Sequence, residues 1–152
     1  MEMIMFIGIQ ASGKSSLYRD RFVDTHQRLN LDVLRTRHRE RLLLDAFVAA
    51  KAPFVVDNTN VTAAERARYL APARLAGFRC IGYWLQCSID EALARNAARP
   101  LDSIVPDEAI RATRNRLEAP SIAEGFDELY VVRTRPSHAY EFEPWGEQRV
   151  AI

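Results

Sequence analysis

Residues 3–16 read "MIMFIGIQASGKSS", an apolar run that leads directly into a glycine-rich segment. A continuous apolar run of this kind is typical of a strand buried on both faces of a parallel sheet. Residues 8–15 match the pattern G-x-x-x-x-G-K-[S/T], whose backbone amides surround phosphate oxygens. Because an apolar strand precedes the loop and a helical pattern follows it, the stretch predicts a nucleotide-binding loop.

The fixed residues of this loop have separate chemical tasks. Glycines let the amides point inward, the Lys14 ammonium reaches the β and γ phosphates, and the Ser15 hydroxyl binds magnesium. The amino end of the following helix adds positive potential. We therefore expect ATP and Mg²⁺ to be bound by Gly8, Gln10, Ala11, Ser12, Gly13, Lys14, Ser15 and Ser16.

Strand and helix patterns alternate along the rest of the chain. Strands are expected at residues 54–58, 78–85 and 128–133, and more weakly at 28–31. Helices are expected from residue 14, over 32–51, after the capping residues Thr62 and Ser88, and near 105–110. This alternation predicts an α/β fold with a parallel sheet covered by helices on both faces, and ligands at the carboxyl ends of the strands.

Composition sets the size and class of the protein. The 152 residues and 48% hydrophobic content suit one domain with a single core. The formal charge of +1 gives no indication of a bulk affinity for polyanions, so any nucleic-acid surface must be a local patch. The amino terminus does not resemble a signal peptide and no apolar run approaches 18 residues, so we expect a soluble, cytoplasmic protein with no membrane partner. Cys80 and Cys87 are expected to be buried free thiols.

An acidic residue follows the second clear strand. Asp57 ends the apolar run "FVV" and should reach the same sheet edge as the loop, where it could orient magnesium together with Ser15 or contact the acceptor. Residues 58–60 extend this polar cluster, and we assign Asn60 to the acceptor side as well. The alternative is that Asp57 caps a turn and its neighbours stabilise that turn.

Two arginines end the helix that Ser88 begins. Arg95 and Arg99 are one helical turn apart, so their guanidinium groups should share a face just before the irregular residues 100–106. Such a pair suits a short lid that closes over ATP and stabilises charge on the transferred phosphoryl group. The alternative is two solvated arginines favoured by the helix dipole.

A candidate acceptor site lies in "NLDVLRTRHRER". Asp32, Arg35 and Arg39 fall at i, i+3 and i+7, which would place a carboxylate and two guanidinium groups along one helical face. An aspartate there could accept the proton of an attacking hydroxyl, and arginines beside it favour an acceptor that carries phosphate. The alternative is an N-cap followed by a solvated face.

Five stretches together resemble a known family. "GIQASGKSS", "LDVLR", "FVVDNTNVTAAERAR", "ARNAARP" and "EGFDELYVV" look like the kinase domain of bacterial and phage 5'-hydroxyl polynucleotide kinases. Short single-domain bacterial proteins described as predicted kinases or ATP-binding proteins of that group resemble the chain even more. The resemblance implies a P-loop NTPase with the five-stranded parallel sheet of adenylate-kinase-like enzymes. It places the kinase domain at residues 1–135 and leaves 136–152 as a C-terminal tail.

The resemblance also implies roles for single residues. Lys14 and Ser15 would bind ATP and magnesium, Asp32 would be the general base, and Arg35 would contact the acceptor's neighbouring phosphate. Asp57 would lie beside the reacting centre, and Arg95 and Arg99 would contact the phosphates from the lid. One departure concerns the acceptor region, because only 21 residues separate Arg35 from Asp57, fewer than in the polynucleotide kinases.

Three functions remain open from the sequence. The first is an ATP- and Mg²⁺-dependent kinase that phosphorylates 5'-hydroxyl ends of RNA or DNA. The second is a kinase for a metabolite, nucleoside or antibiotic, which would have no use for Arg35 and Arg39. The third is a nucleotide-dependent binding module without transfer.

Overall fold

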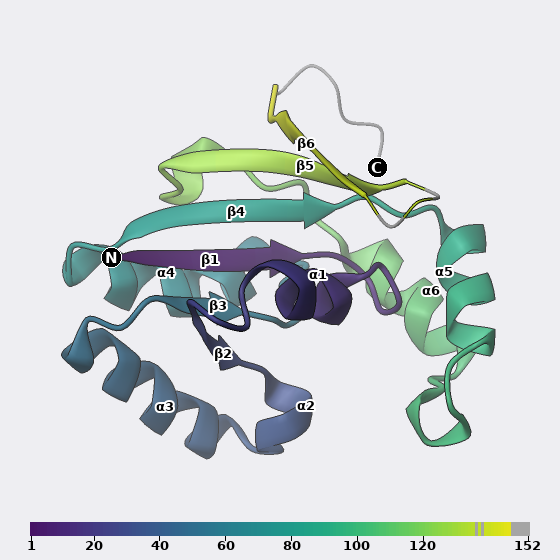
Figure 1. The fold of residues 1–152 in the computed structure, drawn as a ribbon, viewed down its shortest axis with the longest axis horizontal. Coiled ribbons are helices and arrows are strands. Elements are labelled where there is room, and N and C mark those ends of the chain that lie inside the picture. Colours follow the sequence, from purple (N-terminus) through teal and green to yellow (C-terminus); the bar gives the residue numbers. More distant parts are fainter. Residues whose placement is uncertain (136, 138, 147–152) are drawn as a thin grey trace.

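The computed structural model describes residues 1–135, 137 and 139–146. Its sheet has the strand order β2-β3-β1-β4-β5-β6 (Figure 1). The strands are β1 (Glu2–Ile7), β2 (Gln27–Leu29), β3 (Phe54–Val56), β4 (Arg79–Leu85), β5 (Glu128–Thr134) and β6 (Tyr140–Pro144). The first five are parallel and β6 runs antiparallel to β5. The predicted parallel α/β sheet is confirmed, and the sixth strand comes from residues for which the sequence predicts no element.

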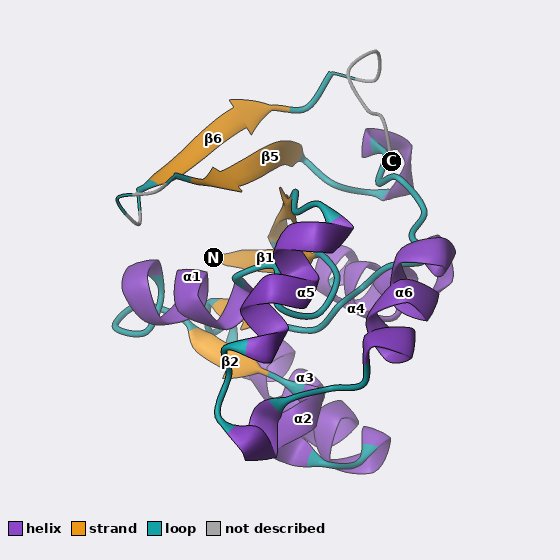
Figure 2. Ribbon diagram, turned by 90° about the vertical axis from the view of Figure 1, so that its right-hand side faces the viewer, coloured by secondary structure: helices purple, strands orange, loops and turns teal. Residues whose placement is uncertain are grey.

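Helices cover both faces of the sheet, and those formed by residues 89–116 lie beyond the carboxyl ends of its strands (Figures 1 and 2). They are α1 (Lys14–Arg21), α2 (Leu31–Leu34), α3 (Arg37–Ala50), α4 (Ala63–Leu75), α5 (Ile89–Ala97) and α6 (Asp107–Arg116), with two short 3₁₀ turns, η1 (Leu101–Ser103) and η2 (Ile122–Glu124). Helix α1 packs on one face, whereas α3 and α4 pack on the other. Helices α5 and α6 pack against each other beside the glycine-rich loop, through Ile9, Ala92 and Ile110.

Strand β1 lies at the centre of the core. Met3, Met5 and Ile7 join the cluster under α3 and α4, whereas Ile4 and Phe6 join the cluster under α1. All five side chains are at most 1% exposed. Burial on both faces explains why the run is apolar at every position instead of alternating.

The continuous helix expected over residues 32–51 is wrong. The chain forms α2, turns at Arg35 with φ 75°, and begins α3 at Arg37. Each helix has its own N-cap: the Asn30 side chain accepts the Val33 N–H at 3.0 Å at the start of α2, and the Thr36 side chain accepts the Arg39 N–H at 3.2 Å at the start of α3. Each cap starts a separate helix. The apolar periodicity of the sequence continues through the turn between the two helices, so this pattern alone does not indicate the turn.

The other predicted helix ends are confirmed in part. Thr62 and Ser88 each accept an N–H three residues on, from Glu65 and Glu91. The Glu65 carboxylate does not complete a capping box, because it accepts the Val61 N–H instead. Gly77 follows α4 with φ 83°, a left-handed conformation that favours glycine.

Aromatic side chains attach β6 and the residue after it to the sheet. The Phe142 ring lies 5.2 Å from Tyr83, and the Trp145 ring lies 4.8 Å from Trp84, measured between centroids. Residues 136, 138 and 147–152 of the expected tail lie outside the described part of the chain.

The two cysteines differ in environment. Both are free, but only Cys80 is buried, so the expectation of two buried thiols is wrong for the half-buried Cys87. In the described residues, no helix has the length and apolar character needed to cross a membrane.

Candidate active site

The glycine-rich loop joins the carboxyl end of β1 to the first turn of α1. A Cβ at Gly8 would lie 2.7 Å from the Ser12 Oγ and 3.2 Å from the carbonyl oxygen of Leu85. Gly13 has φ 104°, a conformation that side chains disfavour. Gly13 is therefore favoured by its backbone conformation, and Gly8 by the close approach of the Ser12 side chain and the Leu85 carbonyl oxygen.

Lys14 lies against the loop that precedes it. Its Nζ donates to the carbonyl oxygens of Gly8 at 3.0 Å and Ile9 at 2.7 Å. Burial lowers the pKa of Lys14 to about 8, an effect that Asp57 and Asp32 oppose and Arg99 reinforces. All three of these charged residues are predicted members of the site.

This lowered pKa predicts how ATP binding depends on pH. Phosphates bind the charged ammonium, so affinity should be fully present below pH 8 and fall as the pH rises above 8 and the free protein loses this proton. The fall is expected to approach about tenfold per pH unit. It is checked by measuring the dissociation constant of ATP between neutral and alkaline pH.

Lys14→Arg is the control, because a guanidinium stays charged throughout this range. Its ATP affinity should not change across pH 8. An equal fall in the variant and the natural protein would show that another group titrates.

Asp57 follows β3 and is 1% exposed. The Ser15 Oγ donates to its Oδ2 at 3.5 Å, so the two predicted metal-binding residues face each other. Both are hard oxygen donors, as Mg²⁺ requires. Among the described residues, no three His, Cys, Asp or Glu side chains form a metal site. With the Ser15 and Asp57 oxygens as the donors from the protein, the other ligands of a magnesium ion would be phosphate oxygens and water, which is the usual arrangement at such loops.

Arg28 is part of this centre and was missed from the sequence. It lies on β2, donates from Nε to the Asp57 Oδ2 at 2.8 Å, and donates from Nη2 to the Ser15 Oγ at 3.0 Å. The available signal was a basic residue in the short strand that precedes, in the chain, the strand that Asp57 follows. It went unused because that strand was only weakly predicted.

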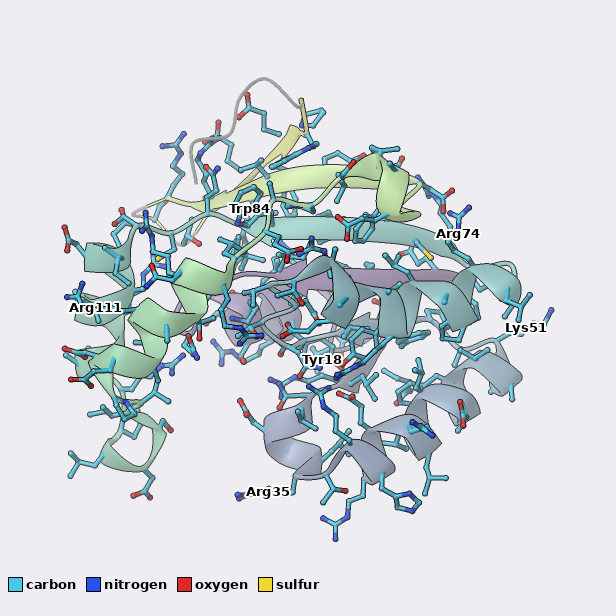
Figure 3. All side chains as sticks on the ribbon, turned by 180° about the vertical axis from the view of Figure 1, so that it is seen from behind. Tyr18, Arg35, Lys51, Arg74, Trp84 and Arg111 are labelled. Atoms are coloured by element: carbon cyan, nitrogen blue, oxygen red, sulfur yellow. The ribbon has the colours of Figure 1, made fainter. Side chains whose placement is uncertain are left out.

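Asp32 and Arg35 both belong to α2 and its end. Asp32 is exposed in the first turn, and Arg35 occupies the strained positive φ where α2 stops. Arg35 projects from the outer end of α2 (Figure 3). Arg39 lies on α3 and donates to the Leu34 carbonyl oxygen at 3.2 Å. The single face expected for Asp32, Arg35 and Arg39 is therefore wrong, since the turn separates them.

Asparagines fix α2 to the segment that carries Asp57. The Asn30 Nδ2 donates to the Asp57 carbonyl oxygen at 2.6 Å, and the Asn58 Oδ1 accepts the Leu31 N–H at 2.9 Å. The Asn58 Nδ2 in turn donates to the buried Glu40 at 3.0 Å. The elements bearing Asp32 and Asp57 are thus held as one unit.

Asn60 does not fit its predicted role at the acceptor. It is 2% exposed, has φ 49°, and donates from Nδ2 to the Phe6 carbonyl oxygen at 2.7 Å. Its amide is used to join the end of β1 to the loop after β3. We therefore correct this assignment to a structural one.

The predicted lid begins where α5 ends. Arg95 donates from Nη1 to the Ser12 carbonyl oxygen at 3.4 Å, which connects α5 to the glycine-rich loop. Arg99 lies just past the helix and donates to the Ser103 carbonyl oxygen at 3.5 Å. The ends of the intervening segment are joined by Asn96, which exchanges two hydrogen bonds with the Val105 backbone.

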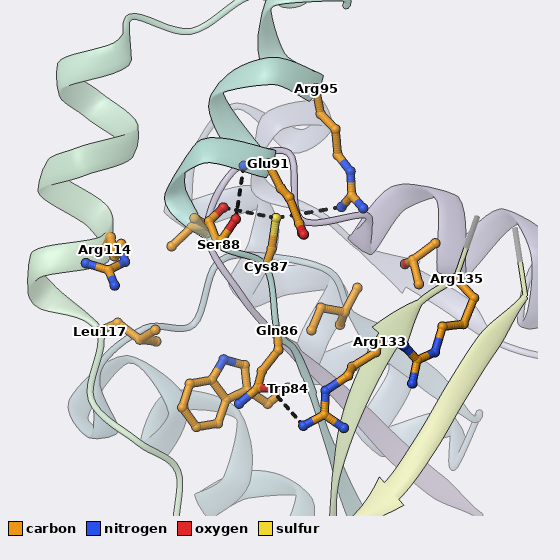
Figure 4. Close-up of a pocket in the computed structure, with 13 residues that line it drawn as sticks. Trp84, Gln86, Cys87, Ser88, Glu91, Arg95, Arg114, Leu117, Arg133 and Arg135 are labelled. Carbon is orange, nitrogen blue, oxygen red and sulfur yellow. Dashed lines mark hydrogen bonds between the residues drawn. The ribbon is translucent and has the colours of Figure 1, made fainter. Parts of the chain in front are cut away.

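Two cavities lie beside Arg95. One, of about 360 Å³, has arginines around it from α5, α6 and the end of β5: Arg95, Arg114, Arg133 and Arg135 (Figure 4). The other, of about 770 Å³, is lined by Gly13, Ser16, Arg95 and Thr134. The larger cavity therefore adjoins the phosphate loop directly.

The family described as "AAA domain" matches residues 3–120, which is most of the chain. The chain belongs to this AAA domain family. The match includes the glycine-rich loop, α2, Asp57 and both lid arginines of this AAA domain.

One curated relative of the AAA domain is the bifunctional polynucleotide phosphatase/kinase of Schizosaccharomyces pombe. The two are 29% identical over 152 residues, which cover 95% of this chain and 36% of the relative. The chain thus spans about a third of that protein's length. This relative bears out the resemblance to polynucleotide kinases found in the sequence.

Solved structures similar to the AAA domain share its fold. A gluconokinase from Sinorhizobium meliloti aligns with a TM-score of 0.61 and 18% identity, over 87% of this chain and 82% of that chain. Kti12 from Chaetomium thermophilum, in complex with ADP-AlF3, aligns with a TM-score of 0.65 and 15% identity, over 90% and 92%. The fold is that of the P-loop kinases, which implies nucleotide binding, and the kinase relative supports an enzyme.

Proposed function

We propose that this protein is a kinase that transfers the γ-phosphoryl group of ATP, with Mg²⁺, to the 5'-hydroxyl end of RNA or DNA. The observation that carries the proposal is the attachment of α2, which bears Asp32, to the segment that bears Asp57, through the hydrogen bonds of Asn30 and Asn58. The Asp32 carboxylate is exposed and, within the described residues, makes no side-chain hydrogen bond. A free carboxylate on an element fixed to the Asp57 segment is suited to accept the proton of an attacking hydroxyl.

The phosphate loop and the larger cavity would together bind ATP, the phosphoryl donor. The phosphates of ATP would lie against the loop amides and Lys14, and the nucleoside would extend into the cavity lined by Ser16, Arg95 and Thr134. When bound, magnesium would neutralise charge on the β and γ phosphates, held by Ser15 and, through water, by Asp57.

In the transfer step, Asp32 takes the proton from the 5'-hydroxyl. The acceptor oxygen forms a bond to the γ-phosphorus as the bond from that phosphorus to the bridging oxygen of ADP breaks. Lys14, Arg95 and Arg99 stabilise the negative charge on the transferred group. The products are ADP and a 5'-phosphorylated end.

The position of Arg35 is evidence for an acceptor that itself carries a phosphate group. Arg35 lies three residues after Asp32 and, within the described residues, its guanidinium makes no hydrogen bond or ion pair. A free guanidinium beside the general base matches the phosphate that follows the first nucleotide of a nucleic-acid end.

A small-molecule kinase is the second candidate, and one observation favours it. Arg39, which would extend an arginine surface beside Arg35, is instead engaged by the Leu34 carbonyl oxygen. With the short stretch between Arg35 and Asp57, this leaves a small acceptor region. A neutral alcohol would need no more than Asp32 on this side.

A labelled-ATP screen across 5'-hydroxyl oligonucleotides, nucleosides and sugars tests the proposal. We expect transfer to oligonucleotides, and we expect Arg35→Ala to raise their KM by about tenfold or more, since a charged hydrogen bond contributes roughly 1.5–3 kcal/mol. Arg41→Ala, at an exposed arginine of α3, should leave KM unchanged.

Transfer to nucleosides or sugars alone, with no effect of Arg35→Ala, would establish the second candidate. ATP binding without transfer to any acceptor would indicate a binding module instead.

A further inference from the structure

The guanidinium of Arg28 lies between the two side chains that fit magnesium. Its Nη2 is 2.7 Å from the Asp57 Oδ2 and 3.0 Å from the Ser15 Oγ. These two oxygens are themselves 3.5 Å apart. An internal cation therefore contacts the same pair of oxygens that a magnesium–nucleotide complex would use.

Burial explains why Asp57 needs such a partner. Its carboxylate is 1% exposed, and a buried charge without a counter-ion is strongly unfavourable. Arg28 provides the opposite charge from the neighbouring strand β2, with a side chain that is 30% exposed. The Asp57 carboxylate is thus enclosed by protein, whereas the Arg28 side chain is in contact with solvent.

Arg28 also has a second contact that does not involve the oxygens. Its Cζ lies 5.4 Å from the centroid of the Tyr18 ring, within the range of a cation–π interaction. The Tyr18 hydroxyl donates to the His26 carbonyl oxygen at 2.7 Å, which fixes that ring on α1. The guanidinium can therefore leave Ser15 and still be held over the tyrosine.

We propose that Arg28 is a built-in counter-ion that occupies the magnesium position of the free protein and must release Ser15 when the metal–nucleotide complex binds. A dication bound at the Ser15 oxygen would repel a guanidinium that lies 3.0 Å from the same oxygen. Arg28 therefore competes with magnesium and sets how strongly the metal assists nucleotide binding. The inference rests on the proposed metal-dependent function of this site.

Arg28→Gln tests the competition directly. The measurement is the dissociation constant of ATP with and without Mg²⁺, by calorimetry, whose ratio gives the assistance from the metal. We expect this ratio to increase by about tenfold or more. The figure follows from the effect of one neighbouring opposite charge on a carboxylate, which changes its affinity for a proton by at least about tenfold. Arg28→Lys, which keeps the charge but not the two-pronged contact, should fall between the variant and the natural protein.

Arg21→Gln is the matched control, because it removes the same charge from the far end of α1, where Arg21 contacts Tyr140 and Phe142. It should leave the ratio unchanged. Circular dichroism and thermal unfolding of each variant show whether it is folded at the temperature used. If Arg28→Gln does not fold, the comparison of Arg28→Lys with Arg21→Gln decides the question.

Two results would overturn the inference. If Arg28→Gln weakens metal-free ATP binding and leaves the ratio unchanged, then Arg28 is a phosphate ligand. If neither constant changes, the ion pair is only structural. Neither measurement needs an acceptor, so failure of 5'-hydroxyl transfer and failure of the Arg28 inference are distinguishable.

Discussion

Asp32→Asn is expected to lower the rate of phosphotransfer by about 10²–10⁴-fold, the usual contribution of a general base. The amide has the size and shape of the carboxylate but cannot accept the hydroxyl proton. ATP binding should be retained, because Asp32 is exposed on α2 and makes no hydrogen bond to the phosphate loop among the described contacts. Single-turnover transfer of labelled phosphate, with ATP affinity measured separately, separates these two quantities.

Asp45→Asn, at an exposed position of α3, is the control and should behave as the natural protein does. The proposal for Asp32 fails if Asp32→Asn keeps the full rate, because no base would then be needed there. It also fails if ATP affinity falls as much as the rate, which would assign Asp32 to the organisation of α2. Removal of Asp32 charge should also lower the pKa of Lys14 further, since that carboxylate raises it.

The largest effect on stability is expected at Arg66. This arginine is completely buried in α4, and its Nε and Nη2 donate to Glu124 at 2.7 and 3.1 Å. Its Nη1 donates to the carbonyl oxygens of Asn60 at 2.9 Å and Glu118 at 3.2 Å. Arg66→Met would remove all four of these hydrogen bonds and leave the Glu124 carboxylate without its counter-ion, so it should lower the free energy of unfolding by about 3–5 kcal/mol.

Urea unfolding checks this value against Arg68→Met. Arg68 lies two residues on in the same helix and is exposed, so its replacement should change stability by no more than about 0.5 kcal/mol. The double variant Arg66→Met/Glu124→Met removes both charges and should recover part of the loss. Equal stability of Arg66→Met and Arg68→Met would show that the buried network contributes little.

Patterns local in the sequence predicted the fold well. The apolar run before Gly8 gave the central strand, and the spacing of Gly8, Gly13 and Lys14 gave the loop, because both depend on backbone geometry and burial within a few residues. Thr62, Ser88 and Gly77 marked helix ends for the same reason. Such features are determined by neighbours in the chain.

The site was predicted less completely, because its contacts join residues far apart in the chain. Arg28 reaches Asp57 across 29 positions, and the weakly predicted strand at residues 28–31 is the one local indication of the pair. The turn at Arg35 was missed because an apolar periodicity continues through it, although Asn30 and Thr36 each cap a separate helix. Asn60 was misassigned because a polar side chain after a strand can serve the backbone as well as a ligand.

Strand β6 forms one edge of the sheet and covers the edge that β5 would otherwise expose to solvent. Without it, β5 would present unpaired N–H and C=O groups beside Val131 and Val132, the kind of surface through which sheets of different molecules join. β6 pairs with β5 from Tyr140 to Pro144, and its charged residues Glu141 and Glu143 discourage addition of another strand. On the opposite side, β2 is only three residues long. The C-terminal segment thus protects this kinase fold from edge-to-edge aggregation.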